Sequence, residues 1–97
     1  MARVIFHAEA EAEVDAAFDW YWNESPDAAT GFLDELVRTV SLIGRNPRLF
    51  PSVTPSLRKA VLQRYPYYLL FRQKKNAIEV IVVAHAKRKP GYWKSRS

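Results

Sequence analysis

The chain has 97 residues, enough for one domain, and 48% of them are hydrophobic, so it can bury a core and is not a disordered protein. It contains no cysteine, which excludes a disulfide scaffold, a thiolate metal site and a cysteine nucleophile. No apolar run approaches the roughly 18 residues of a membrane span. The N-terminus lacks the apolar stretch of a signal peptide, so we expect a cytoplasmic protein.

The net charge of +5 conceals an uneven distribution along the chain. Residues 1–35 hold nine acids and one base, a net charge of −8, whereas residues 36–97 hold fourteen bases and one acid, a net charge of +13. Such a concentration of positive charge attracts polyanions or acidic protein surfaces. Solubility and internal ion pairing are the alternative explanation.

The N-terminal third predicts one strand and two helices. Residues 3–7 are rich in β-formers and predict a strand. Alanines and acids from Ala8 onward favour a helix, which ends before Pro26. Ser25 is a good N-cap and proline suits the first helical turn, so a second helix follows at once and ends near Gly44. Its apolar residues recur at helical spacing: Ala29, Leu33, Leu36, Val40 and Ile43. The two helices should form an antiparallel hairpin.

The remainder of the chain predicts a loop and three strands. Residues 45–56 contain three prolines and read as a loop. Strand-like runs follow at residues 57–63, 65–72 and 77–84. The last run is apolar at successive positions, which indicates a central strand covered on both faces. We therefore expect a single two-layer α+β domain over residues 1–97, of order β-α-α-β-β-β, with the helical hairpin packed on an antiparallel sheet and a basic tail at 85–97.

The sequence lacks the usual signatures of a cofactor or a metal site. Its three glycines form no phosphate-binding loop, and His7 and His85 do not have the spacing of metal ligands. We therefore expect no cofactor and no metal. Acids near the start of the first helix, Glu9, Glu13 and Asp15, are interpreted as a solvated helix face rather than as paired catalytic carboxylates.

Basic and aromatic residues alternate in the tail. Lys87, Arg88 and Lys89 are followed closely by Tyr92 and Trp93. Arginine binds phosphate bidentately and aromatic rings stack on bases, so the pattern is typical of nucleic-acid binding. Alternatively, the two aromatic residues only pin the tail to the sheet.

A pair of tryptophans on the first helix also indicates a binding surface. Trp20 and Trp22 lie two positions apart, so they cannot both face the core of an α-helical hairpin. One of them is expected to cover a partner surface or an exposed groove.

Short motifs along the whole chain carry a family resemblance. They are Val4-Ile5-Phe6, Trp20-Tyr21, the pattern Ala29…Phe32…Leu36 with Ile43 and Pro47, then Arg58, and the strand Tyr65 to Phe71. The most specific motif is the block from Val82 to Trp93, an aliphatic strand followed by H-x-(K/R)-(K/R)-x-P-x-Y-W. With these motifs the chain resembles the RelE/ParE superfamily of toxins from type II toxin–antitoxin systems, often called plasmid stabilisation proteins.

The resemblance implies a growth-inhibiting toxin that a cognate antitoxin neutralises. RelE-like members cut mRNA on the ribosome, holding the scissile phosphate with arginines and lysines. ParE-like members inhibit DNA gyrase and are not known as nucleases. A strand position at which many members have arginine is Tyr68 in this chain, while the basic position after the last strand is kept as Arg88. The lost arginine weakens transition-state stabilisation and favours the ParE-like branch.

Three alternative functions fit these observations: a gyrase-binding toxin, a ribosome-dependent mRNA endonuclease and a plain nucleic-acid-binding domain. Whether the protein is an enzyme stays open between them. The target-binding residues of the first are predicted to be Arg58, Lys87, Arg88, Lys89, Tyr92 and Trp93. The catalytic set of the second would be Arg58, His85, Arg88 and Tyr92. The antitoxin is expected to contact Trp20 and Trp22 through a segment that folds on binding and carries acidic and apolar residues.

Overall fold

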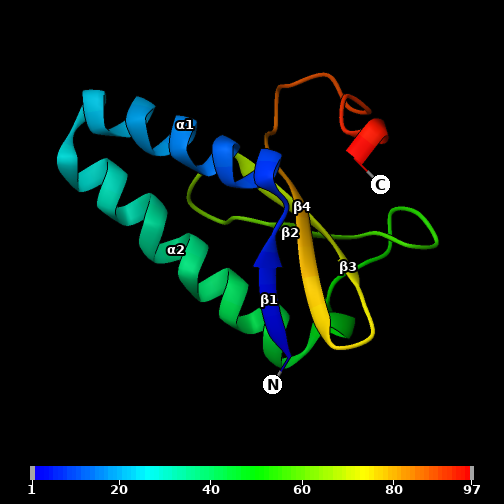
Figure 1. The fold of residues 1–97 in the computed structure, drawn as a ribbon. Coiled ribbons are helices and arrows are strands. Elements are labelled where there is room, and N and C mark those ends of the chain that lie inside the picture. The colour runs from blue at the N-terminus through cyan, green and yellow to red at the C-terminus, as the bar shows by residue number, and fades with distance from the viewer. Residues whose placement is uncertain (1, 97) are drawn as a thin grey trace.

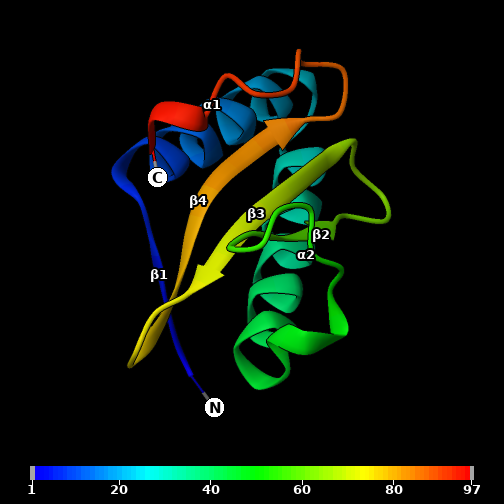
Figure 2. The same ribbon diagram turned by 90° about the vertical axis from the view of Figure 1, so that its right-hand side faces the viewer.

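The elements follow one another in the predicted order (Figure 1). The computed structural model describes residues 2–96. Its elements are β1 (Arg3–Phe6), α1 (Ala8–Glu24), α2 (Pro26–Arg45), the 3-10 turn η1 (Pro47–Leu49), β2 (Arg58–Val61), β3 (Tyr67–Gln73), β4 (Ala77–His85) and the 3-10 turn η2 (Lys94–Arg96). Both long helices lie on one face of the sheet, which confirms the two-layer α+β fold (Figures 1 and 2).

Local capping explains where the helices begin. The His7 side chain accepts a hydrogen bond from the Glu9 N–H at 3.1 Å, and the Ser25 hydroxyl accepts one from the Ala28 N–H at 3.0 Å. A single residue separates the two helices, so they form the predicted hairpin. The second helix runs one residue past Gly44, whose carbonyl accepts a hydrogen bond from the Ala2 N–H at 3.0 Å. Gly44, which its sequence makes a good C-cap, is therefore inside the helix and Asn46 is the C-cap, while the end of α2 is tied to the start of β1.

The sheet has the order β1-β4-β3-β2 and is mixed. Strands β2, β3 and β4 form the predicted antiparallel meander, but β1 pairs with β4 in parallel, so the expected wholly antiparallel sheet is wrong at that edge. The helical hairpin explains the difference. Helix α2 ends beside the start of β1, so the chain enters β2 from the same end of the sheet as it entered β1. β2 therefore runs in the same direction as β1. Two antiparallel reversals then give β4 that same direction.

β4 is buried on both faces, as its apolar pattern predicts. Its side chains on the helix side, such as Val80 and Val83, join a core that includes Phe32 of α2 and Phe71 of β3. Side chains on the opposite face form a second cluster of Leu57, Tyr68, Leu70, Ile81, Val82 and Ala84, against which Tyr92 and Trp93 pack. The C-terminal segment therefore supplies the cover for the second face of the sheet.

β4 is also longer than the strand beside it. β1 pairs only with Ala77 to Val80, so the second half of β4 has no strand on that side among residues 2–96. Helix α1 starts immediately after β1 and runs along this uncovered edge (Figure 2). Three of the predicted site residues, Trp20, His85 and Arg88, line the cavity at this edge.

No helix within residues 2–96 is long and apolar enough to cross a membrane.

Candidate functional site

The basic C-terminal segment is folded against the domain. After β4 the chain turns outward and returns, so that η2 lies beside the first turns of α1 (Figures 1 and 2). Trp93 packs edge-on against Tyr68, with ring centroids 6.1 Å apart, and Tyr92 packs edge-on against Trp93 at 5.2 Å. Arg96 pairs with Glu9 at 2.6 Å. Tyr92 and Trp93 thus pin the tail to the sheet, the arrangement that the sequence left as an alternative.

Glu13 is the centre of the contacts that hold this segment. Its Oε1 accepts hydrogen bonds from the Val83 N–H at 2.9 Å and from Arg96 Nη1 at 2.8 Å. Its Oε2 accepts from the Tyr92 hydroxyl at 2.5 Å and from Arg96 Nη2 at 3.2 Å. Burial alone would raise the pKa of Glu13, but the bonds from Arg96, Tyr92 and Val83 lower it below its ordinary value. The interpretation of Glu13 as part of a solvated face is therefore wrong.

The position of Glu13 follows from the mismatch in strand length. Because β1 stops opposite Val80, the next backbone groups of β4 need other partners. Glu13 accepts from the Val83 N–H, and Arg96 Nη1 donates to the Ile81 carbonyl at 3.0 Å. The side chains of Glu13 and Arg96 thus bond the backbone groups of Val83 and Ile81, which a longer β1 would otherwise have paired.

Arg88 is held beside this cluster without being buried. Its guanidinium carbon lies 3.6 Å from the centroid of the Tyr92 ring, and its Nη1 lies 3.8 Å from Glu13 Oε2. More than half of the side chain, 55%, stays exposed. Lys87 and Lys89, on either side of it, are also exposed. The structure therefore presents a fixed arginine between two exposed lysines.

Tyr92 is a poor candidate for acid–base work in this arrangement. Burial first, and then its hydrogen bond to the carboxylate of Glu13, raise the pKa of the phenol well above its ordinary value. The hydroxyl donates a hydrogen bond to Glu13 and keeps its proton near pH 7.

A groove runs along α1 next to this cluster. One wall is Ala16, Ala17 and Trp20 of α1, and the other is formed by Tyr67, His85 and Arg88, with Glu13 at one end. A second cavity of about 460 Å³ continues it, lined by Trp20, Tyr21, Pro66, Tyr67 and His85. Three residues, Trp20, Tyr67 and His85, line both cavities, so they form one groove with an aromatic end and a basic end.

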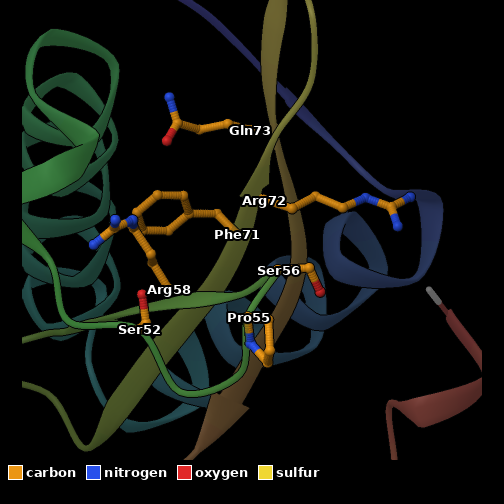
Figure 3. Close-up of a pocket in the computed structure, with 7 residues that line it drawn as sticks. All are labelled: Ser52, Pro55, Ser56, Arg58, Phe71, Arg72 and Gln73. Carbon is orange, nitrogen blue, oxygen red and sulfur yellow. The ribbon is translucent and has the colours of Figure 1, made fainter.

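Arg58 lies away from this groove. Arg58 pairs with Phe71 on β3, whereas His85 pairs with Tyr67, which lies four residues earlier on the same strand, or about 13 Å away at about 3.3 Å per residue. Its Nη1 donates to the Phe50 carbonyl at 2.6 Å. It lines a different cavity with Arg72, and the two side chains extend in opposite directions from the sheet (Figure 3).

Arg72 does not reinforce Arg58 as an anion site. Its guanidinium bonds Glu79 Oε1 at 2.8 and 3.0 Å, and Lys74 Nζ lies 3.3 Å from the same oxygen. Arg72 and Lys74 therefore both pair with Glu79 at the β3–β4 hairpin. Of the predicted catalytic set, the structure brings together His85, Arg88 and Tyr92 and leaves Arg58 apart.

Comparison with known proteins places the chain in a family. The family described as "ParE toxin of type II toxin-antitoxin system, parDE" matches residues 4–90. The chain belongs to this ParE toxin family. Membership makes it a type II toxin–antitoxin protein and implies an antitoxin partner.

Solved structures agree with this fold. A chain from the chromosomal ParDE system of P. aeruginosa is similar with a TM-score of 0.77 and 24% identity, covering 90% of this chain and 98% of that one. The isolated E. coli RelE toxin is similar with a TM-score of 0.60 and 19% identity, covering 99% and 96%. Among curated proteins none matches the sequence. The likenesses support the shared RelE/ParE fold.

The two tryptophans predicted to contact the antitoxin occupy different surroundings in this ParE-family toxin. Both are exposed, Trp20 at 59% and Trp22 at 52%. Tyr21, between them, faces the core and contacts Phe32. Trp20 lines the groove, whereas Trp22 stacks on Phe18 with centroids 5.9 Å apart. Only Trp20 therefore shares a surface with Arg88.

The sequence did not indicate that Glu13, Ala16 and Tyr67 line the groove of this ParE-family toxin. A signal for Glu13 was available. It lies three residues after Ala10 and four before Ala17, the two buried residues of α1, so it belongs to the buried face of the helix. An acid on such a face calls for a basic partner elsewhere in the chain.

Proposed function

We propose that this ParE-family toxin inhibits DNA gyrase by binding it, and that a cognate antitoxin neutralises it. The single observation that carries the proposal is that the Tyr92 hydroxyl donates to Glu13. The aromatic residue of the RelE-like set is thus committed to a structural carboxylate. The place of action is then the cytoplasm, where the gyrase is found.

The chemistry around Arg88 favours binding over cleavage. Acid–base catalysis of phosphodiester cleavage needs a group whose pKa lies near the working pH, and the pKa of Tyr92 is raised far from it. The carboxylate of Glu13 lies 3.8 Å from Arg88 Nη1, so it opposes the doubly negative transition state of phosphodiester cleavage more strongly than it opposes a singly charged carboxylate of a protein partner. Arg58, the second predicted phosphate ligand, bonds Phe50 in another cavity. An acidic protein surface meets fewer of these obstacles.

The surface that we assign to gyrase binding is the exposed part of the C-terminal segment. Lys87, Arg88 and Lys89 supply charge, and the half-buried Tyr92 and Trp93 fix the backbone that carries them. A fixed arginine is typical of binding hot spots, because little side-chain freedom is lost on binding. Arg58 remains a predicted contact only if the target also reaches the opposite end of the sheet.

Purified toxin and gyrase test the proposal directly. Supercoiling and the amount of trapped cleavage complex are measured with the wild-type toxin, with Arg88→Glu and with the control Lys75→Glu, an exposed lysine in the β3–β4 turn. We expect the wild type and the control to inhibit alike and Arg88→Glu to require at least about tenfold more protein. No effect of folded wild-type toxin at tenfold excess over gyrase would refute the proposal.

Ribosome-dependent mRNA cleavage is the second candidate. The observation in its favour is that His85 and Arg88 line one groove, so an imidazole and a guanidinium face the same space. Primer extension on transcripts after induction tests it, since cleavage produces cuts at defined positions in translated codons. Intact transcripts during growth arrest would exclude this candidate.

A further inference from the structure

Four arginines outside the groove form a second positively charged surface, which we call the arginine face. Arg38 and Arg45 belong to α2, Arg48 belongs to η1, and Arg64 lies in the loop between β2 and β3. All four side chains are exposed. Within residues 2–96 none of the four forms an ion pair with a carboxylate, so their charge is not neutralised by the fold.

The arginine face extends over the last two turns of α2 and the segments beside them. Arg38 and Arg45 are seven residues apart on α2, so their side chains project from the same side of the helix, about 10.5 Å apart along its axis. Arg64 and Arg38 line one cavity of about 280 Å³, and Arg48 lies in the turn that follows α2. Figure 1 shows α2 along one margin of the domain and the C-terminal segment on the opposite side. The arginine face is therefore accessible while the C-terminal segment contacts another partner.

A buried acid holds this face in place. Glu35 of α2 is only 6% exposed, and its carboxylate accepts hydrogen bonds from the backbone N–H groups of Gln63 and Arg64, the latter at 3.1 Å. These bonds fix the loop that carries Arg64, so that residue is kept beside Arg38. Glu35 thus positions an arginine through its backbone and leaves the guanidinium open to a ligand.

The chemistry of the arginine face suits the phosphates of a duplex. An unpaired guanidinium binds a phosphate through two parallel hydrogen bonds. Phosphates of one DNA strand follow one another every 3.4 Å or so along the helix axis, so two arginines about 10.5 Å apart match phosphates about three steps apart. The exposed apolar residues on this part of α2, Val37 and Leu42, are aliphatic, whereas the core of a protein interface is rich in aromatic residues. Charge without an aromatic anchor favours a polyanion over a protein partner.

We propose that the arginine face binds the phosphate backbone of duplex DNA, so that a toxin held on gyrase by its C-terminal segment also binds the DNA on which the enzyme acts. The bridging of enzyme and DNA rests on the proposed function, whereas the DNA contact does not. Because the two surfaces lie on opposite sides of the domain, one toxin molecule contacts protein and DNA at once (Figure 1). Such a bridge opposes the movement of the DNA relative to the enzyme.

Fluorescence anisotropy of a short labelled duplex tests the DNA contact, with the purified full-length toxin and no gyrase. The variant combines Arg38→Gln with Arg45→Gln, and the control combines Lys75→Gln with Lys89→Gln, which removes two exposed charges elsewhere. Glutamine forms helices about as well as arginine, so α2 should persist, and circular dichroism verifies it.

The variant should bind DNA at least about tenfold more weakly than the wild type, and the control should differ from the wild type by less than about threefold. The slope of log K against log salt should become shallower by about 1.8 in the variant, because each phosphate contact contributes about 0.9. Equal losses in variant and control would overturn the proposal, because net charge alone would then explain them. Tighter binding of duplex RNA of the same sequence, or displacement of the DNA by polyglutamate at equal charge, would also overturn it, since either result assigns the face to another partner.

The amount of cleaved DNA trapped on gyrase tests the bridge. The variant with Arg38→Gln and Arg45→Gln should trap at least about tenfold less cleaved DNA than Lys75→Gln at the same toxin concentration. Equal trapping by the two proteins contradicts the bridge. A wild-type toxin that binds the duplex yet leaves gyrase active removes only the proposed target, because the DNA affinity is measured without the enzyme.

Discussion

Replacing Glu13 by Gln should unfasten the C-terminal segment and lower the stability of the whole domain. The substitution keeps the shape of the side chain but removes the charge and places an amide donor where two acceptor oxygens now receive four hydrogen bonds. At least one donor from Val83, Tyr92 or Arg96 then loses its acceptor. The Arg96 side chain is only 8% exposed, so little solvent can replace the lost bonds.

The magnitude follows from these contacts. Removing one partner of a buried ion pair costs about 3–5 kcal/mol, and a hydrogen bond to a charged group contributes about 1.5–3 kcal/mol. Arg96 keeps Glu9 as a second carboxylate partner, although Glu9 is 61% exposed. We therefore expect a loss of about 2–3 kcal/mol, at or just below the lower limit of the first range. For a domain of this size that corresponds to a fall in Tm of about 10–20 °C.

Thermal unfolding followed by circular dichroism measures this loss, with Glu11→Gln as the control. Glu11 is an exposed acid on the same helix and should change the free energy of unfolding by less than about 0.5 kcal/mol. Trypsin should also cut after Lys87 or Arg88 faster in Glu13→Gln than in the wild type, because the released segment is accessible. A Tm within about 2 °C of the wild type, together with unchanged proteolysis, would show that the Glu13 cluster does not hold the segment.

Three further predictions concern pH, the helical hairpin and the chemistry of the groove. Burial alone would raise the pKa of Glu13 and of Glu79, but their arginine partners lower both pKa values below the ordinary 4.5. These two carboxylates therefore contribute fully to stability above pH 4.5, and their contribution is lost as the pH falls through the lowered pKa values. The pKa of Tyr92 is raised above 10.0, so stability should also fall as the pH rises beyond that value, and unfolding across pH 3–11 should trace both declines. A Cβ added at Gly31 would collide with the Tyr65 hydroxyl, so Gly31→Ala should cost about 1–3 kcal/mol by chemical denaturation, and less than about 1 kcal/mol when Tyr65→Phe is also present. Tyr92→Phe should leave gyrase inhibition within about threefold of the wild type, whereas a loss of about a hundredfold or more in a cleavage assay would assign acid–base work to that hydroxyl.

The architecture follows from local patterns in the sequence, which is why most of it was predictable. Ser25-Pro26 defines the junction of the helices, and the apolar run of β4 defines its central place in the sheet. The parallel pairing of β1 with β4 depends instead on where the helical hairpin returns the chain. That return is a long-range property, visible in the bond from Ala2 to Gly44, and no residue of β1 encodes it.

The candidate site was predictable in composition but not in arrangement. Arg88 and Trp20 could be proposed as binding residues because a basic motif and an exposed aromatic are local signals. That they share one groove depends on the packing of α1 along β4, so the sequence alone assigned them to different partners. Arg58 was assigned to the same site from its charge and its place in the chain, but its side chain donates to the Phe50 carbonyl and lines another cavity.

The uneven charge of the chain acquires a structural meaning from these contacts. Part of the positive charge of residues 36–97 is used internally, since Arg96 pairs with Glu9 and Glu13, and Arg72 pairs with Glu79. The internal pairing that the sequence left as an alternative is therefore real, but it does not extend to Lys87 and Lys89, which are exposed, and it reaches Arg88 only at 3.8 Å. The acids of α1 thus fix the segment in place while the cations beside them stay directed at solvent. The toxin has already positioned this arginine when a partner carboxylate binds it. Most of the conformational entropy that the arginine side chain loses is therefore lost during folding and not on binding.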